Sequence, residues 1–178
     1  EEMDPGDAAD LLGELTPERA EELLGIVEPD DAKDLRRLLT YDEKSAGGIM
    51  TTEPVILSHD ATVAEALARI RNEELPTSLA AQVYVTRSPL ETPTGHFLGV
   101  VHFQRLLREQ PGTLVSSLVD TDLESVDPEA PLDEVVRHFA RYNLVGLPVV
   151  DNNDHLLGVV TVDDVVDNML PEDWRESH

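Results

Sequence analysis

The sequence predicts an α+β protein in which a short helical-repeat domain precedes a larger domain made of two similar halves. Two observations carry this prediction: a twelve-residue repeat near the start of the chain, and a longer repeat of strand-like and helix-like segments after it. The length of 178 residues and the apolar content of 40% allow one large or two small domains with substantial cores. Aromatic residues make up 4% of the chain, so we expect these cores to be aliphatic.

Residues 4–40 repeat with a period of twelve, as DPGDAADLLGEL, TPERAEELLGIV and EPDDAKDLRRLL. Each unit opens with Asp, Thr or Glu, whose oxygen suits the N-cap, followed by proline, which suits the first helical position. Each unit then places alanine and leucine on one face. We expect three short helices that pack on each other or on a neighbour, because each is too short to be stable alone.

A longer repeat begins near residue 50. PVILSHDATVAEALARI (54–70) aligns with LESVDPEAPLDEVVRHF (123–139), and FLGVVHFQRLL (97–107) aligns with LLGVVTVDDVV (156–166). The aligned helical stretches carry apolar residues at helical spacing, and the stretches VYVT and PVVD between the blocks are β-like. Each copy therefore reads strand, helix, strand, turn, strand, helix.

The connection between the last two strands differs between the copies. DNND (151–154) is a good turn in the second copy, whereas RSPLETPTG (87–95) in the first copy is longer and proline-rich, as expected of a surface loop. Two copies of such a half normally pack around a pseudo-twofold axis and bury sheets that neither copy covers alone. We expect one two-repeat domain of about 120 residues.

Acidic residues dominate the charge of the chain. The 37 Asp and Glu residues against 13 Lys and Arg give a net charge of −24, so nucleic acid is not an expected partner, because its phosphates would be repelled. The compact chain also repels itself, and cations should stabilise it where carboxylates converge on folding. A host with a high-salt cytoplasm would favour the same composition, and this alternative stays open.

Several function classes find no support in the sequence. The absence of cysteine excludes disulfides and thiolate chemistry and fits a reducing cytosol. No apolar run approaches the roughly 18 residues that a membrane-spanning helix needs, although both ends of the chain look like cuts from something longer. We do not expect an enzyme, because no catalytic constellation is convincing: Ser116 and Ser117 have no evident base, and the six histidines show no metal-ligand spacing. They are His59, His96, His102, His138, His155 and His178.

The duplicated pattern resembles a pair of CBS domains, known as a Bateman module, in GVVTVDD and GLPVVD of the second copy and GVVHFQR of the first. YDEKSAGGIMT (41–51) is more specific, and its glycines should make a tight joint. With helical units such as DAADLL it resembles the cytosolic part of MgtE-type magnesium channels, where a helical N domain leads into two CBS domains. The resemblance implies an N domain at 1–48, CBS domains at 49–112 and 113–170, and a tail at 171–178.

The same resemblance implies a function. In that family a transmembrane pore follows the second CBS domain, and the magnesium-loaded closed form of the cytosolic part holds the pore shut. We therefore expect a Mg²⁺-sensing regulatory region on the cytoplasmic face of the cell membrane, homodimeric through its CBS domains, with the membrane pore domain outside this chain. The alternative is a soluble regulatory adaptor that binds an adenine nucleotide, ATP or AMP.

Two acidic groups are candidates for magnesium ligands. Mg²⁺ prefers oxygen ligands and keeps several waters, so a site needs two or more carboxylates held near each other. Asp7 and Asp10 are three residues apart on one predicted helix face, and Asp163 and Asp167 are four apart on another, with Asp164 beside them. If the helical repeat folds against the second CBS half, the two faces meet, and divalent ions between them remove the repulsion.

The simpler explanation for any one of these acids is that it caps or solubilises a short helix, since acids are favoured near a helix N-terminus. First-turn positions explain Asp30, Asp31 and Asp34 well, so we do not expect those three to bind an ion. The family resemblance falls on Asp10 and on the pair Asp163 and Asp164, and it implies ion binding there.

The second copy also contains a candidate nucleotide pocket. Gly158, Thr161 and Asp164 have a Gly-x-x-Thr-x-x-Asp spacing. CBS domains that bind adenosine use such a threonine near the phosphates and such an aspartate on the ribose hydroxyls, a role that suits a carboxylate acceptor. Val145 and Pro148 would supply an apolar wall for the base.

The first copy departs from this pattern. His102 and Arg105 stand at the corresponding positions, where the ribose contact is lost, so we expect at most one good adenosine site per chain. These two residues are expected to be ordinary surface groups at the start of a helix. In the second copy, Asp164 cannot easily serve both a ribose and an ion cluster, so its two assignments compete.

Overall fold

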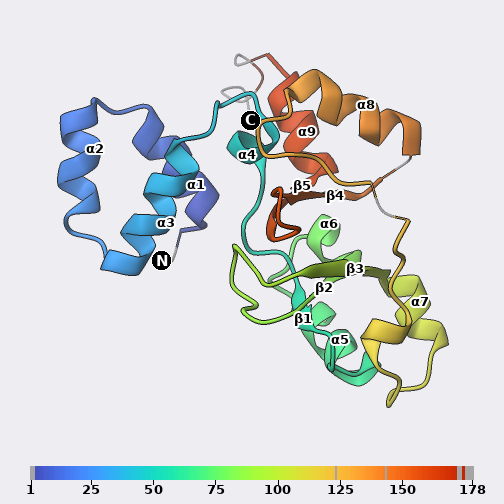
Figure 1. Cartoon of the computed structure of the whole chain (residues 1–178). Helices are drawn as coiled ribbons and strands as arrows, with labels where there is room; N and C mark the ends of the chain where they lie inside the picture. Colours follow the sequence, from blue (N-terminus) through green and yellow to red (C-terminus); the bar gives the residue numbers. More distant parts are fainter. Residues whose placement is uncertain (1–2, 123, 143, 172–173, 175–178) are drawn as a thin grey trace.

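The computed structural model describes residues 3–122, 124–142, 144–171 and 174, and Figure 1 traces it from three N-terminal helices to two units of strands and helices. In chain order its elements are α1 (Pro5–Gly13), α2 (Pro17–Leu24), α3 (Pro29–Leu39), α4 (Ala46–Ile49), β1 (Ile56–Ser58), α5 (Val63–Ile70), α6 (Thr77–Ala80), β2 (Gln82–Thr86), β3 (Phe97–His102), α7 (Phe103–Arg108), the 3-10 helix η1 (Val115–Ser117), α8 (Leu132–Tyr142), β4 (Gly146–Val150), β5 (Leu156–Thr161) and α9 (Val162–Met169). The first repeat unit comprises β1 to α7, and the second comprises α8 to α9.

The three helices predicted from the twelve-residue repeat are confirmed. They begin at Pro5, Pro17 and Pro29, where a missing N–H is tolerated because it would have no partner within the helix. Helices α1 and α3 pack against each other. The buried side chains of the three helices are Ala9, Leu12, Leu24, Ala32, Leu35 and Leu38. This packing stabilises helices that are too short to persist alone.

Residues 44–51, here called the joint segment, precede the first repeat unit in sequence but bind the second repeat unit in space. The N–H of Ala46 donates to the carbonyl of Ala130 at 2.8 Å, and the N–H of Gly47 donates to the carbonyl of Pro128 at 2.7 Å. The expected tight joint is a single helical turn, α4.

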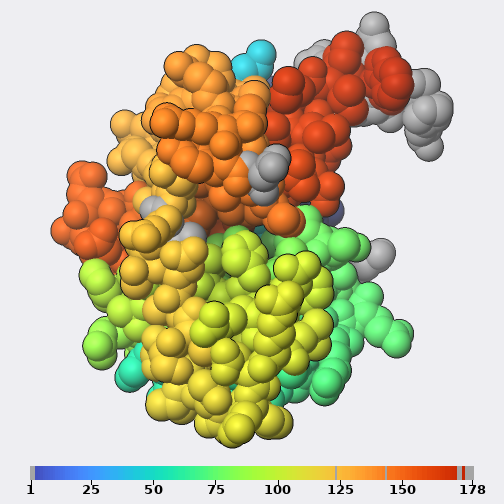
Figure 2. Space-filling model, turned by 90° about the vertical axis from the view of Figure 1, so that its right-hand side faces the viewer, coloured from blue at the N-terminus to red at the C-terminus, as the bar shows by residue number. Residues whose placement is uncertain are grey.

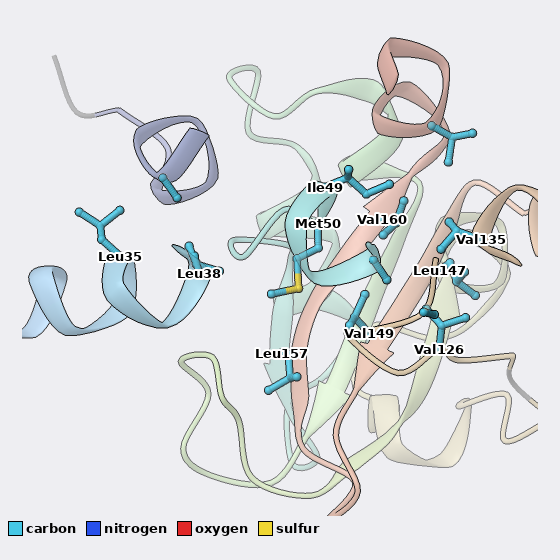
Figure 3. Packing of buried hydrophobic residues seen from close by; sticks show 14 of the residues in the cluster. Leu35, Leu38, Ile49, Met50, Val126, Val135, Leu147, Val149, Leu157 and Val160 are labelled. Carbon is cyan, nitrogen blue, oxygen red and sulfur yellow. The ribbon is translucent and has the colours of Figure 1, made fainter. Parts of the chain in front are cut away.

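Beyond α4, the joint segment pairs with strand β5. The N–H of Thr51 donates to the carbonyl of Val159 at 2.8 Å, and the N–H of Val159 donates to the carbonyl of Thr51 at 2.9 Å. In the view of Figure 3, Met50 lies between Leu38 of α3 and strand β5, within one buried cluster that includes residues of the N-terminal helices and of the second repeat unit. The joint segment therefore attaches the N-terminal helices to the second repeat unit.

The first repeat unit follows the predicted order of elements. Strand β1 pairs in parallel with β2, and β2 pairs antiparallel with β3. Helices α5 and α7 contact each other, and the unit has its own aliphatic core. The short helix α6 was not expected. The loop over residues 87–95 is exposed at its start, as predicted, but Thr94 and Gly95 are buried.

The second repeat unit departs from the expected pattern at its first strand. Strands β4 and β5 form an antiparallel pair, but the strand predicted from LESV (123–126) is wrong for the residues that the structure describes. They contribute a single parallel bridge, between Val126 and Val149. The reason is local: Asp127 begins a turn, and Pro128 has no N–H with which to extend a ladder.

The two repeat units stack on each other, with the second above the first in Figure 2. Tyr84 of the first unit is buried in one cluster with Leu156 and Val159 of the second. The side-chain amide of Gln82 donates to the Tyr84 hydroxyl oxygen at 2.6 Å and to the carbonyl of Gly146 at 3.3 Å. A β-carbon on Gly146 would stand 2.5 Å from that hydroxyl, so the contact requires glycine. The predicted two-repeat domain is therefore confirmed.

The joint segment supplies a test of this packing. A β-carbon added to Gly47 would stand 2.6 Å from the ring of Tyr41, so Gly47→Ala should lower the free energy of unfolding by about 1–3 kcal/mol despite the better helix propensity of alanine. Tyr41→Ala removes the obstructing ring, and the double variant should lose less stability than the sum of the single variants. The measurement is urea denaturation followed by circular dichroism.

Gly112→Ala is the matched control. A β-carbon on Gly112 has no heavy atom within 4 Å, so this change should stay within about 0.5 kcal/mol of the parent. Strictly additive effects of the Gly47 and Tyr41 changes would contradict the contact described here.

Candidate functional site

The candidate residues of the second repeat unit gather where β5 ends and α9 begins. The hydroxyl of Thr161 accepts from the N–H of Asp164 at 3.2 Å, and the carboxylate of Asp164 accepts from the N–H of Thr161 at 2.9 Å. This reciprocal pair is a capping box, which satisfies two backbone donors at the start of the helix. The hydroxyl of Thr51, in the joint segment, also donates to the Asp164 carboxylate at 3.4 Å.

The Asp164 carboxyl differs electrostatically from an exposed acid. Burial raises its pKa, which the hydrogen bonds from Thr161 and Thr51 partly oppose, and the nearby charge of Asp167 raises it further. The Coulomb effect acts in this direction because a like charge disfavours the ionised form. A positive charge beside this carboxylate would favour its ionised form.

The other predicted magnesium ligands lie on two separate helices. Asp163 and Asp167 are exposed on α9, and Asp7 and Asp10 are exposed on α1. Among the described residues, no three carboxylate or imidazole side chains are grouped closely enough to hold a metal ion. The five carboxylates therefore form an α1 group and an α9 group, and a site shared between them stays a prediction.

The joint segment connects these two groups. A β-carbon on Gly6, beside Asp7, would stand 3.4 Å from the carbonyl oxygen of Met50. The next residue, Thr51, reaches Asp164 through its hydroxyl. The starts of α1 and α9 thus contact consecutive residues of one segment, and Figure 1 shows α4 between the N-terminal helices and α9. Sequence reasoning missed Met50 and Thr51, whose apolar and hydroxyl side chains carry no ligand signal.

The predicted nucleotide residues lie in or beside strands β4 and β5 and at the start of α9, and part of the space there is filled. The carbonyl of Val145 accepts from the N–H of Val162 at 3.0 Å, and Pro148 is buried in β4. A β-carbon on Gly158 would stand 2.7 Å from the sulfur of Met50 and 2.8 Å from the carbonyl oxygen of Thr51. A nucleotide seated on Gly158 therefore requires the joint segment to move, and this site stays a prediction.

In the first copy, His102 and Arg105 are exposed at the start of α7, as predicted. The guanidinium of Arg105 forms an ion pair with the carboxylate of Glu109 at 3.1 Å. The Arg105 side chain therefore pairs with the residue that follows the end of its own helix.

A pocket of about 360 Å³ beside α8 was not anticipated. Its lining residues are Glu124, Glu134, Arg137, His138, Arg141 and Tyr142. The guanidinium of Arg141 lies 5.2 Å from the centroid of the Tyr142 ring, and Nδ1 of His138 lies 3.2 Å from the Glu124 carboxylate. The run RHFARY in an otherwise acidic chain is the sequence signal for this basic and aromatic pocket.

The fold consists of N-terminal helices followed by two stacked units of strands and helices. This arrangement is that of proteins in which a helical domain precedes a pair of CBS domains. A model of the CBS domain matches residues 46–112 and 115–171, and a model of the MgtE intracellular N domain matches residues 1–44. The chain belongs to the CBS-domain family, and its domain combination is that of the cytosolic part of MgtE-type magnesium transporters.

Comparison with individual proteins gives the same result. The chain is 32% identical over 132 residues to the magnesium transporter MgtE of Enterococcus faecalis, covering 74% of this chain and 28% of that protein. It is 33% identical over 141 residues to MgtE of Thermus thermophilus, covering 79% of this chain and 30% of the relative. It thus spans less than a third of the length of these two relatives.

A solved structure is similar over almost the whole chain. The cytosolic domain of the Mg²⁺ channel MgtE in complex with ATP superposes with a TM-score of 0.79 at 30% identity, covering 94% of this chain and 66% of that structure. No helix among the residues described here is both long and apolar enough to span a bilayer.

The raised pKa of Asp164 predicts a specific pH dependence. When an acid has a higher pKa in the folded state than in the unfolded state, its ionisation lowers stability, and this loss disappears once both states are protonated. Asp164→Asn can keep the acceptor for the Thr161 N–H without the charge. We expect the stability of this variant relative to the parent to be greater at neutral pH than at about pH 4, measured by urea unfolding.

Asp163→Asn provides the control, because it removes a charge from the same helix without touching the capping box. An unchanged pH dependence in Asp164→Asn, or an equal change in both variants, would show that burial of the Asp164 carboxylate does not affect stability.

Proposed function

We propose that this chain is the Mg²⁺-sensing regulatory region of an MgtE-type magnesium transporter or channel, at the cytoplasmic face of the membrane, with the pore domain outside the chain. One observation carries the proposal: the joint segment contacts the start of α1 through Met50 and the acidic start of α9 through Thr51. The family membership and the magnesium transporters among its relatives support it.

The mechanism follows from charge. The chain carries a net charge of −24, and the α1 and α9 groups repel each other whenever the N domain approaches the second CBS domain. Hydrated Mg²⁺ between Asp7 or Asp10 on one side and Asp163, Asp164 or Asp167 on the other removes that repulsion. Occupancy then favours the closed arrangement by RT ln(1 + [Mg²⁺]/Kd), about 1–3 kcal/mol per site at tens of Kd.

Several such sites acting together suffice to switch a two-state arrangement. Because the joint segment is hydrogen-bonded to the second CBS domain, a shift of the N-terminal helices acts on that domain first. A pore joined to the end of the second CBS domain would therefore sense cytosolic Mg²⁺ through the position of α9.

Magnesium should stabilise the chain through these acids. We expect millimolar Mg²⁺ to raise the free energy of unfolding by about 1–3 kcal/mol per occupied site and to slow proteolysis within residues 40–53. Asp10→Asn and Asp163→Asn should each weaken both effects. The measurements are thermal unfolding and limited proteolysis over a Mg²⁺ titration, beside KCl at equal ionic strength.

Asp31→Asn is the control, because Asp31 lies in the first turn of α3, where the helix dipole explains an acid. The proposed site is wrong if KCl reproduces the Mg²⁺ effect, or if the Asp10 and Asp163 variants respond to Mg²⁺ as the parent does.

Binding of an adenine nucleotide is the second candidate function, favoured by the similar cytosolic domain that was solved with ATP. The residues proposed for it are Val145, Pro148, Gly158, Thr161 and Asp164. Addition of ATP or AMP to the same unfolding experiment separates the candidates, because a nucleotide effect without a Mg²⁺ effect would favour a nucleotide-sensing adaptor.

We propose homodimerisation from the apolar residues that α7 and α9 leave exposed. Phe103 and Leu107 on α7 occupy the same repeat positions as Val162 and Val166 on α9, and all four are at least 38% exposed. A pair of equivalent apolar patches related by a pseudo-twofold axis suits a second copy of the chain, whose symmetry would bury both patches together.

The doubly substituted chain Leu107→Glu/Val166→Glu should sediment as a monomer at concentrations where the parent is a dimer, because charges would be buried in the interface. The control is Ile26→Glu, which places a charge on an apolar residue in the turn between α2 and α3 that is 80% exposed. A monomeric parent, or a double variant that stays dimeric, would contradict this interface.

A further inference from the structure

Two histidines occupy equivalent positions in the two repeat copies and meet between the repeat units. His96 precedes FLGVV in the first copy, and His155 precedes LLGVV in the second. The structure pairs them in an isolated antiparallel bridge. Equivalent residues of the two halves thus face each other, as expected for a pair close to the pseudo-twofold axis.

The backbone hydrogen bonds define the geometry of this pair. The N–H of Phe97 donates to the carbonyl of Asp154 at 2.7 Å, so the bond flanks the histidine pair instead of joining it. Residues opposite each other at such a non-hydrogen-bonded position have Cα atoms about 4.5 Å apart, with side chains on the same face of the ladder. His96 and His155 therefore start from neighbouring backbone positions on one face.

The ring of His155 is held in one tautomer. Its Nδ1 lies within hydrogen-bond distance of the carbonyl oxygen of Thr94. A carbonyl only accepts, so Nδ1 carries the proton, and Nε2 keeps a free lone pair when the ring is neutral. Metal-binding histidines commonly donate their second ring N–H to a carbonyl in this way, which fixes the ring and raises the basicity of the ligand nitrogen.

Thr94 is itself fixed in place. It is 1% exposed, its hydroxyl accepts from the N–H of Leu156 at 3.1 Å, and that hydroxyl donates to the carbonyl of Gly95 at 2.7 Å. Thr94, which holds the His155 ring, is therefore buried and hydrogen-bonded to residues of both repeat units. His96, in contrast, is exposed, and its ring can rotate toward His155.

We propose that His96 and His155 bind a divalent transition-metal ion, such as Ni²⁺, Cu²⁺ or Zn²⁺, across the two CBS domains. Imidazole nitrogen suits these ions, whereas Mg²⁺ prefers oxygen. The protein supplies two ligands and water completes the coordination, in keeping with the absence of larger ligand groups among the described residues. An ion bound here would link the end of the loop over residues 87–95 in the first copy to the end of the turn over residues 151–154 in the second. This site is separate from the carboxylates proposed for magnesium.

The test is Ni²⁺ binding to the full 178-residue chain by isothermal titration calorimetry, with millimolar Mg²⁺ present to occupy carboxylates. We expect one tighter site per chain, and at least about a tenfold loss of affinity in His96→Ala and in His155→Ala. Paramagnetic broadening by Ni²⁺ or Cu²⁺ in NMR spectra should centre on residues 94–97 and 153–156. His102→Ala, which removes another exposed histidine, should bind as the parent does.

The His96 variant keeps the test decisive if His155→Ala unfolds, because the exposed ring of His96 can be removed without disturbing Thr94. The proposal is overturned if His96→Ala binds Ni²⁺ as tightly as the parent, or if the broadening centres on other histidines. Loss of binding in both variants, with unchanged thermal unfolding in the absence of metal, would support the site.

Discussion

The attachment of the joint segment to the second CBS domain is the constraint on which the rest of the arrangement depends. Four backbone hydrogen bonds named above hold residues 46–51 to the 128–130 loop and to β5. Gly47 and Gly158 leave no room for a side chain at these contacts. Met50 and Thr51 each also contact a helix start, so the N-terminal helices and α9 share one connecting segment.

The exchange of segments between the two CBS domains is reciprocal. The joint segment leads into the first domain but completes the second, while the stretch after α7 leads into the second domain but binds the first, where the N–H of Val63 donates to the carbonyl of Thr113 at 2.9 Å. Neither domain is complete without chain that belongs, in sequence order, to the other. Each connecting segment is therefore held by backbone hydrogen bonds to the domain that it completes.

The two metal sites proposed for this chain lie in different parts of the fold. Carboxylates on α1 and α9 lie on either side of the joint segment, where hard cations would relieve repulsion. The paired histidines lie instead where the two CBS domains meet, with a fixed tautomer that suits softer ions. The raised pKa of Asp164 shows how burial beside the joint segment already works against ionisation at the start of α9, which a bound cation would offset.

The three proline-started helices, the two repeat copies and the acidic candidates could be predicted from the amino-acid sequence, because they depend on local caps, periodicity and composition. The strand predicted over 123–126 is wrong for its described residues 124–126, because a turn at Asp127 and the missing N–H of Pro128 leave them a single bridge. Three contacts could be found only in the folded chain: the joint segment covers Gly158, Thr51 reaches Asp164, and His96 pairs with His155. These contacts join residues about 60 to more than 100 positions apart, and such pairings arise from packing around the pseudo-twofold axis, which no local pattern encodes.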